Sequence, residues 1–162
     1  MRPSRKHVPE TVAVDKAEPT LTFLGHVWAL AHALDVASRR MDRELGVTGP
    51  QRFVIRMVGM HPQISAGDLA RQLRLNPSTL SLLIAKLEKR GLLTRAGDRL
   101  DGRRSLFALT SKGRALDRTR TGTIEARVGA TLARTPRAQV EAAAAVMALL
   151  SSDLLADKRP AR

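Results

Sequence analysis

The sequence predicts a mainly α-helical protein with a small β-hairpin wing, built as a winged helix-turn-helix between N- and C-terminal dimerisation helices. Two short helices joined by a tight turn are expected between residues 66 and 90, and two short strands follow at residues 92–109. On both sides of this unit, apolar residues recur every three or four positions, which is typical of long amphipathic helices. A hairpin directly after a helix pair is the arrangement that this fold class requires.

The helix pair has clear start and stop signals. The first helix is expected at about residues 66–73 and the turn at residues 74–76. Asn76 is suited to cap the second helix, Pro77 to occupy its first position and Gly91 to end it in the left-handed conformation. Its core-facing residues have helical spacing: Leu80, Leu83, Ile84 and Leu87. In this motif, the second helix enters the DNA major groove.

The hairpin that follows is strongly basic. Its strands are expected at residues 92–95 and 105–109, separated by a loop that contains two glycines. Residues 71–112 hold ten basic and three acidic side chains, and the whole chain has a formal net charge of +13. Such a charge favours a polyanionic partner, although a solvated helix pair with a charged hairpin would give the same composition.

Candidate DNA contacts lie on the exposed face of the second helix and in the hairpin. At the N-terminal end of that helix, hydroxyl and apolar side chains are expected to contact base edges, and Lys86 a phosphate. An arginine at the tip of the wing is suited to a narrow minor groove, and Asp101 is expected to orient Arg103, unless the two form an ordinary solvated pair. The predicted DNA-binding residues are Ser78, Thr79, Ser81, Leu82, Lys86, Arg99, Arg103 and Arg104.

Four further helices are expected. The first covers residues 21–45 and ends at Gly46, and the next covers residues 50–60, with Phe53, Val54, Met57 and Val58 facing inward. After the wing, one continuous helix is expected from Ser111 to about residue 134, and another begins after Pro136.

The outer helices have more apolar surface than one small head can bury. Residues 21–45 and 111–156 are therefore expected to pair with the same helices of a second chain, although packing within a monomer is the alternative. The DNA-binding region then covers residues 46–110. Residues 1–20 are expected to form a mobile basic arm, and residues 157–162 a tail.

Residues 87–113 resemble the signature of the MarR family, in which L-E-x-x-G-L leads into a wing of form D-x-x-D-x-R and closes on L-T-x-x-G. The matching residues are Leu87, Glu88, Gly91, Leu92, Asp98, Asp101, Arg103, Leu109, Thr110 and Gly113. The segment LGVTGPQ is similar to the family's L-G-L-T-x-x-Q, and the resemblance extends over roughly residues 21–155. It implies a homodimeric winged-helix transcriptional regulator. Leu82 and Ala85 depart from the Arg and Asp that relatives often carry.

Other classes of function find little support. The chain has no cysteine, which excludes disulfides and the thiol-oxidation sensing of one MarR-like branch. Its four histidines are scattered, and no catalytic or phosphate-binding motif occurs, so neither a metal site, a cofactor nor an enzyme is expected. No apolar run of 18 residues and no signal segment are found, which predicts a cytoplasmic protein without a membrane partner.

A small anionic or aromatic ligand is the remaining candidate partner. Relatives with this architecture commonly hold one between the dimer helices and the reader head. Trp28, His32, Asp68 and Arg95 are the candidate effector residues, and they loosely resemble the set found in the urate-responsive branch. Trp28 is equally explained as part of a dimer core.

The sequence thus predicts a homodimer that binds a pseudo-palindromic operator in double-stranded DNA and acts as a repressor that a small molecule releases. An architectural or RNA-binding winged-helix protein without ligand response is the alternative, and a protein-interaction module is a third class. A register-specific footprint with two equivalent half-sites would distinguish the first from the others.

Overall fold

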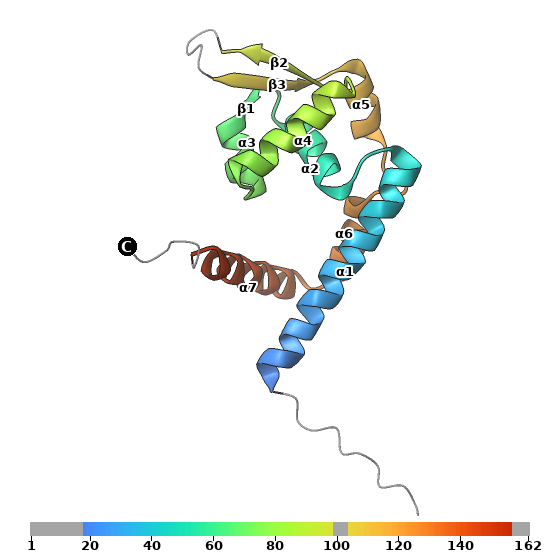
Figure 1. Cartoon of the computed structure of the whole chain (residues 1–162). Helices are drawn as coiled ribbons and strands as arrows, with labels where there is room; N and C mark the ends of the chain where they lie inside the picture. The colour runs from blue at the N-terminus through green and yellow to red at the C-terminus, as the bar shows by residue number, and fades with distance from the viewer. Residues whose placement is uncertain (1–17, 99–103, 157–162) are drawn as a thin grey trace, which may run out of the picture.

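A computed structural model describes residues 18–98 and 104–156. In chain order the elements are α1 (Pro19–Leu45), α2 (Gly49–Met60), β1 (Ile64–Ser65), α3 (Ala66–Leu73), α4 (Pro77–Lys89), β2 (Leu93–Gly97), β3 (Ser105–Leu109), α5 (Ser111–Arg118), α6 (Ile124–Leu132) and α7 (Arg137–Ala156). Elements α2 to β3 and α5 form a compact head, while α1, α6 and α7 form a helical frame that extends from it (Figure 1). The predicted fold class is confirmed.

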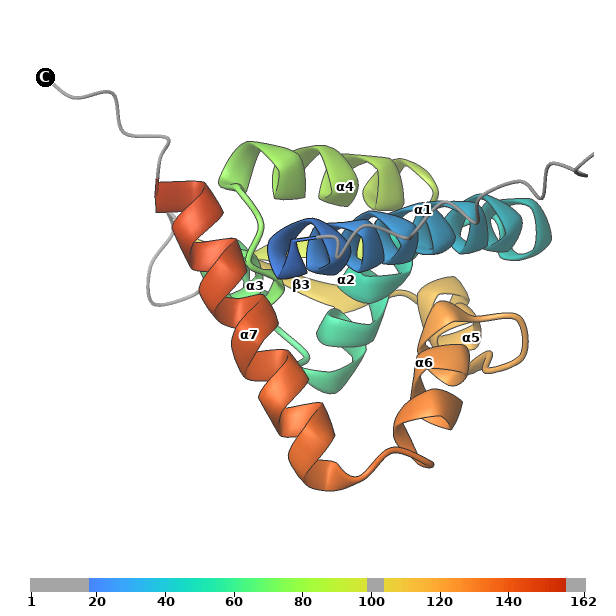
Figure 2. The ribbon, with the colours of Figure 1, turned by 90° about the horizontal axis from the view of Figure 1, so that it is seen from below.

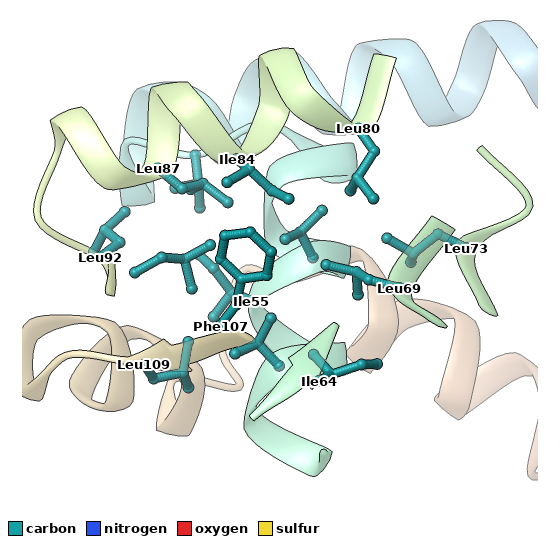
Figure 3. Close-up of a cluster of buried hydrophobic side chains, with 14 residues drawn as sticks. Ile55, Ile64, Leu69, Leu73, Leu80, Ile84, Leu87, Leu92, Phe107 and Leu109 are labelled. Carbon is teal, nitrogen blue, oxygen red and sulfur yellow. The ribbon is translucent and has the colours of Figure 1, made fainter. Parts of the chain in front are cut away.

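The core of the head forms where α2, α3 and α4 pack on the sheet (Figure 3). Phe107 of β3 is 1% exposed and lies among the apolar side chains of the three helices. The predicted inner face of α4 holds, since Leu80, Ile84 and Leu87 are buried and Leu83 packs against them. Each such aliphatic side chain contributes roughly 1.5–3 kcal/mol when it leaves water.

The sheet has three antiparallel strands in the order β1-β3-β2. The two strands of the wing pair from Leu93 opposite Leu109 to Gly97 opposite Ser105. The strand β1, which the sequence analysis did not predict, pairs Ile64 with Phe107. Its two residues are too few for a recognisable alternation, and they are fixed by the neighbouring strand.

Capping side chains set the helix boundaries that the sequence indicated. The Asn76 Oδ1 atom accepts a hydrogen bond of 3.0 Å from the amide of Ser78, and Pro77 follows as the first residue of α4. Gly91 has a φ of 65°, the left-handed conformation predicted for the end of α4, and Gly46, where the first helix was predicted to end, has a φ of 71°. The Thr110 Oγ1 atom accepts from the amide of Gly113 at the start of α5.

The prediction of one continuous helix from residue 111 to about residue 134 is wrong. Helix α5 ends at Arg118 and α6 begins at Ile124, with Gly122 at a φ of 78° between them. A side chain from α2 causes the break, because the guanidinium of Arg52 donates to the backbone carbonyls of residues 116, 117 and 119. Thr123, which is fully buried, then caps α6.

The inward face of α2 also differs from the expectation. Phe53 is 53% exposed, whereas Ile55 and Arg52 are almost completely buried. Val54, Val58 and, in part, Met57 pack in the core as expected. The helix is therefore enclosed on two sides, by the head core and by the α5–α6 connection. Its buried face is wider than the single apolar stripe that the sequence predicted.

Helix α7 stands apart from the head and is joined to α6 by a short loop (Figure 2). None of its residues is buried, although residues 142–150 are all apolar. It satisfies the length and composition of a membrane span, with a mean hydropathy of 1.3 over 18 residues. The expectation that no apolar stretch is long enough to span a membrane is thus corrected. The unbroken apolar run covers only residues 142–150, but the mean hydropathy of an 18-residue window in α7 is still high enough.

Candidate DNA-binding surface and effector cavity

The exposed face of α4 presents most of the side chains that the sequence singled out for DNA. Ser78, Thr79 and Ser81 lie exposed in its first half and Lys86 in its second. Leu82 is 67% exposed on the same face. The Ser78 hydroxyl donates to Asn76 at 2.9 Å, so the cap also fixes this side chain.

An ion pair attaches the wing to α4. The guanidinium of Arg95 on β2 binds Glu88 through two hydrogen bonds of 3.0 Å each and lies 5.2 Å from the ring centre of Phe107. Hydrogen bonding to Glu88 raises the pKa of Arg95, while burial acts in the opposite direction. Two parallel bonds restrict the orientation of both groups. Arg95 therefore positions the wing relative to α4.

A second polar cluster holds the other side of the wing. Arg104, the residue before β3, has its Nη2 atom 3.4 Å from the Asp68 carboxylate on α3. The Ser65 hydroxyl donates to the same carboxylate at 2.5 Å, and Arg71 pairs with it as well. The hydrogen bond from Ser65 lowers the pKa of Asp68, and the charges of Arg71 and Arg104 act in the same direction. Arg99, Asp101 and Arg103, which were predicted to form the tip of the wing, lie outside the described residues.

The end of α4 is also connected to the helical frame. The Arg90 guanidinium donates to the carbonyl of Gly46, which ends α1. The Lys112 ammonium group on α5 donates in turn to the carbonyl of Arg90 at 3.2 Å. These two hydrogen bonds connect the ends of α1 and α4 with the start of α5.

A cavity of about 710 Å³ lies between the helical frame and the head. Ligand sites commonly have volumes of roughly 300–1,000 Å³ and are mainly apolar. The wall comes from α1, α2, the end of α3, the α3–α4 turn and α6. Its residues are Leu34, Asp35, Ser38, Met41, Gly49, Pro50, Arg52, Phe53, Arg56, Leu73, Leu75, Ile124, Glu125 and Val128.

The structure does not bring the predicted effector residues together in this cavity. Trp28 is 67% exposed on α1, and His32 lines a separate shallow hollow beside Arg40, Arg43 and Arg127. Asp68 and Arg95 are engaged in the wing contacts described above. The sequence did carry one signal for the actual cavity, namely two arginines at positions 52 and 56 on the inner side of an apolar helix.

Comparison with known proteins agrees with this geometry. A model of the MarR family matches residues 45–104. The chain is 30% identical over 109 residues to the HTH-type transcriptional repressor Rv2887 of Mycobacterium tuberculosis. This match covers 67% of this chain and 78% of Rv2887. The chain belongs to the MarR family. It is also 36% identical over 90 residues to the regulator TtmR of Methylorubrum extorquens, covering 56% of this chain and 46% of TtmR.

Solved structures of MarR regulators share the fold. Sco3205 from Streptomyces coelicolor, solved in complex with DNA, superposes with a TM-score of 0.71 at 24% identity, covering 90% of this chain and 94% of its own. PcaV from the same species, solved with its natural ligand, superposes with a TM-score of 0.67 at 24% identity. The superposition covers 84% of this chain and 96% of PcaV. As a MarR-type protein, this chain is a DNA-binding transcriptional regulator and not an enzyme.

Proposed function

We propose that this MarR-family chain is a homodimeric repressor that binds a pseudo-palindromic operator in double-stranded DNA and is released from it by a small molecule. The observation that carries the proposal is the exposed face of α4. Ser81 and Leu82 are exposed to solvent there, while the opposite face of the helix is buried in the head. A helix fixed on one side and open on the other is what major-groove recognition requires.

Different side chains of α4 are expected to contact bases and phosphates, according to their chemistry. Ser78, Thr79 and Ser81 can donate to and accept from base edges, and Leu82 can contact a thymine methyl group. Lys86 and Lys89, exposed further along the helix, are suited to phosphates. The relative Sco3205 and the Staphylococcus aureus protein MepR were each solved in complex with DNA, which supports the same use of this head.

The helical frame supports a dimer. Large apolar side chains are exposed along all three of its helices: Leu21, Phe23, Val27, Trp28, Leu30, Leu34, Val36, Val128, Leu132, Val146, Met147, Leu149, Leu150, Leu154 and Leu155. A monomer in water would leave this surface uncovered. We propose a second copy as the partner of α7 in place of a lipid bilayer, since a regulator must reach DNA, and we expect the protein in the cytoplasm. Two-fold symmetry would then require two operator half-sites.

The cavity is the proposed effector site. It lies between α1 and α6 of the frame and α2 of the head, so an occupant can change the angle between these parts. The relative PcaV was solved with its natural ligand, which supports a ligand response in this fold. Because Arg90 connects α1 to α4, such a change would reach the DNA-reading helix.

Selection of bound sequences from random duplexes, followed by footprinting, tests the proposal. We expect two equivalent half-sites about 10 base pairs apart or a multiple of that spacing. The double variant Ser81→Ala, Leu82→Ala should lose this sequence preference while keeping salt-dependent binding. Coating of DNA without register, or preference for RNA, would instead identify the architectural or RNA-binding alternative.

A further inference from the structure

The polar side chains in the cavity wall already have partners. Asp35 pairs with Arg39, and the Ser38 hydroxyl accepts from the amide of Gly49 at 2.8 Å. Arg56 binds the Asp117 carboxylate at 2.7 Å. Among the described residues, no buried polar atom of a side chain in this wall lacks a hydrogen-bond partner.

Arg52 is the most deeply buried of these groups, with 1% of its side chain exposed. Its Nε atom donates to the Glu125 carboxylate at 2.6 Å, and its terminal nitrogens donate to carbonyls at the end of α5, including that of Thr119 at 2.7 Å. The Glu125 carboxylate thus neutralises Arg52, the buried arginine of the part of the chain that the structure describes. A buried guanidinium without this partner would carry an uncompensated charge beside an apolar cavity.

The formal charges of the wall cancel as a whole, since it contains two arginines and two acidic residues. The remaining lining is mostly apolar, with Leu34, Phe53, Ile124 and Val128 among its larger members. An anionic ligand would have to displace Glu125 from Arg52 or remain unpaired. A cationic ligand would likewise have to displace Arg52 from Glu125 or remain unpaired. A neutral molecule gains from burial of apolar surface without breaking any of these pairs.

We propose that this cavity selects neutral, predominantly apolar small molecules, and that Glu125 determines this preference by masking the charge of Arg52. The inference rests on the proposed effector site and narrows the ligand class left open by the sequence, which allowed anionic as well as aromatic molecules. Glu125 acts here as a specificity-determining residue, because its negative charge compensates that of Arg52 and so removes the attraction of Arg52 for anionic ligands.

Three probes of similar size and different charge test the proposal: 1-naphthamide, 1-naphthoate and 1-naphthylmethylammonium. Binding to the full-length protein is measured by isothermal titration calorimetry. We expect the neutral amide to bind about ten-fold or more tightly than either ion, because each ion leaves a charge uncompensated. Tighter binding of the naphthoate or the ammonium compound would overturn the proposal. So would the absence of binding by all three, which is also what a cavity filled by a second copy would give.

The variant Glu125→Gln sharpens the test, since it keeps an acceptor for Arg52 but removes the negative charge. We expect naphthoate to gain about ten-fold in affinity while the amide changes little. The matched control is Glu44→Gln, an exposed acid outside the cavity that pairs with Arg40, and it should change neither. An unchanged naphthoate affinity in a folded Glu125→Gln protein would remove Glu125 from the selection. Failure of either experiment leaves the operator footprint intact, so it is distinguishable from failure of the DNA-binding proposal.

Discussion

The head and the helical frame differ in where their apolar side chains lie. In the head, α4 turns Leu80, Ile84 and Leu87 inward and buries them completely or nearly so. In the frame, α7 has no buried residue, and Leu150 and Leu154 are exposed. The apolar core of the head thus closes within one chain, whereas the apolar side chains of the frame are covered only if the proposed second copy binds there. The following changes test this difference, from the largest expected effect to the smallest.

The substitution Leu150→Glu should convert the protein to monomers and abolish operator binding. A carboxylate placed in the proposed interface would lose its hydration without gaining a partner. Sedimentation velocity and gel-shift assays measure the two effects. Ser152→Glu, which adds the same charge on the other side of α7, is the matched control and should remain dimeric. A folded Leu150→Glu protein that still sediments as a dimer would show that α7 does not form the interface.

The substitution Phe107→Ala should lower the free energy of unfolding by about 3–5 kcal/mol, because it leaves a cavity at the centre of the head. Chemical denaturation at fixed protein concentration measures this loss. Leu82→Ala removes a comparable apolar side chain from the exposed face of α4 and should change stability by less than about 0.5 kcal/mol. Equal losses in the two variants would mean that Leu82 is not free of the core.

The substitution Arg52→Met tests the junction between the two parts. It removes the donor from the carbonyls that end α5 and leaves Glu125 unpaired, so we expect a loss of about 3 kcal/mol in unfolding free energy. Arg52→Lys keeps the charge but not the forked geometry and should lie in between. Hydrogen exchange of residues 119–124 should rise in Arg52→Met. Unchanged exchange there would contradict the role of Arg52 in breaking the helix.

Two substitutions on the exposed face of α4 separate phosphate from base contacts. Lys86→Ala should weaken binding to all sequences alike and reduce the salt slope by about 1. Ser81→Ala should cost about 1 kcal/mol at one base step and leave the slope unchanged. Binding titrations at several salt concentrations on operator and random duplexes distinguish the two. A change of preference in Lys86→Ala, with its slope intact, would reverse the assignment.

The smallest effect concerns pH. The Asp68 pKa is lowered in the folded protein, so the stability that its ionised form contributes is present above its ordinary value of 3.8 and is lost as the pH falls through the lowered value. Asp68→Asn should therefore flatten the acid side of the stability profile. Thermal unfolding between pH 2 and 6 checks this, and an unchanged slope in the variant would show that Asp68 has little part in it.

The predictable parts of the fold were those with local causes. Asn76, Pro77 and Gly91 define α4 through capping and backbone geometry, which neighbouring residues determine. The candidate effector site was not predictable in this way. Arg52, Glu125 and Leu34 come from three different helices, and nothing near them in the sequence indicates that they share a wall.

The sequence by itself therefore determined the MarR-type head, the basic wing and the apolar stripes of the outer helices, because helical periodicity and capping act over a few residues. Only the tertiary structure decided that the helix after the wing breaks at residues 119–123, that Phe53 is exposed and that a cavity forms beside Arg52. Each of these depends on contacts between distant segments. A buried guanidinium takes the carbonyls that it can reach in space, and their distance along the chain does not matter.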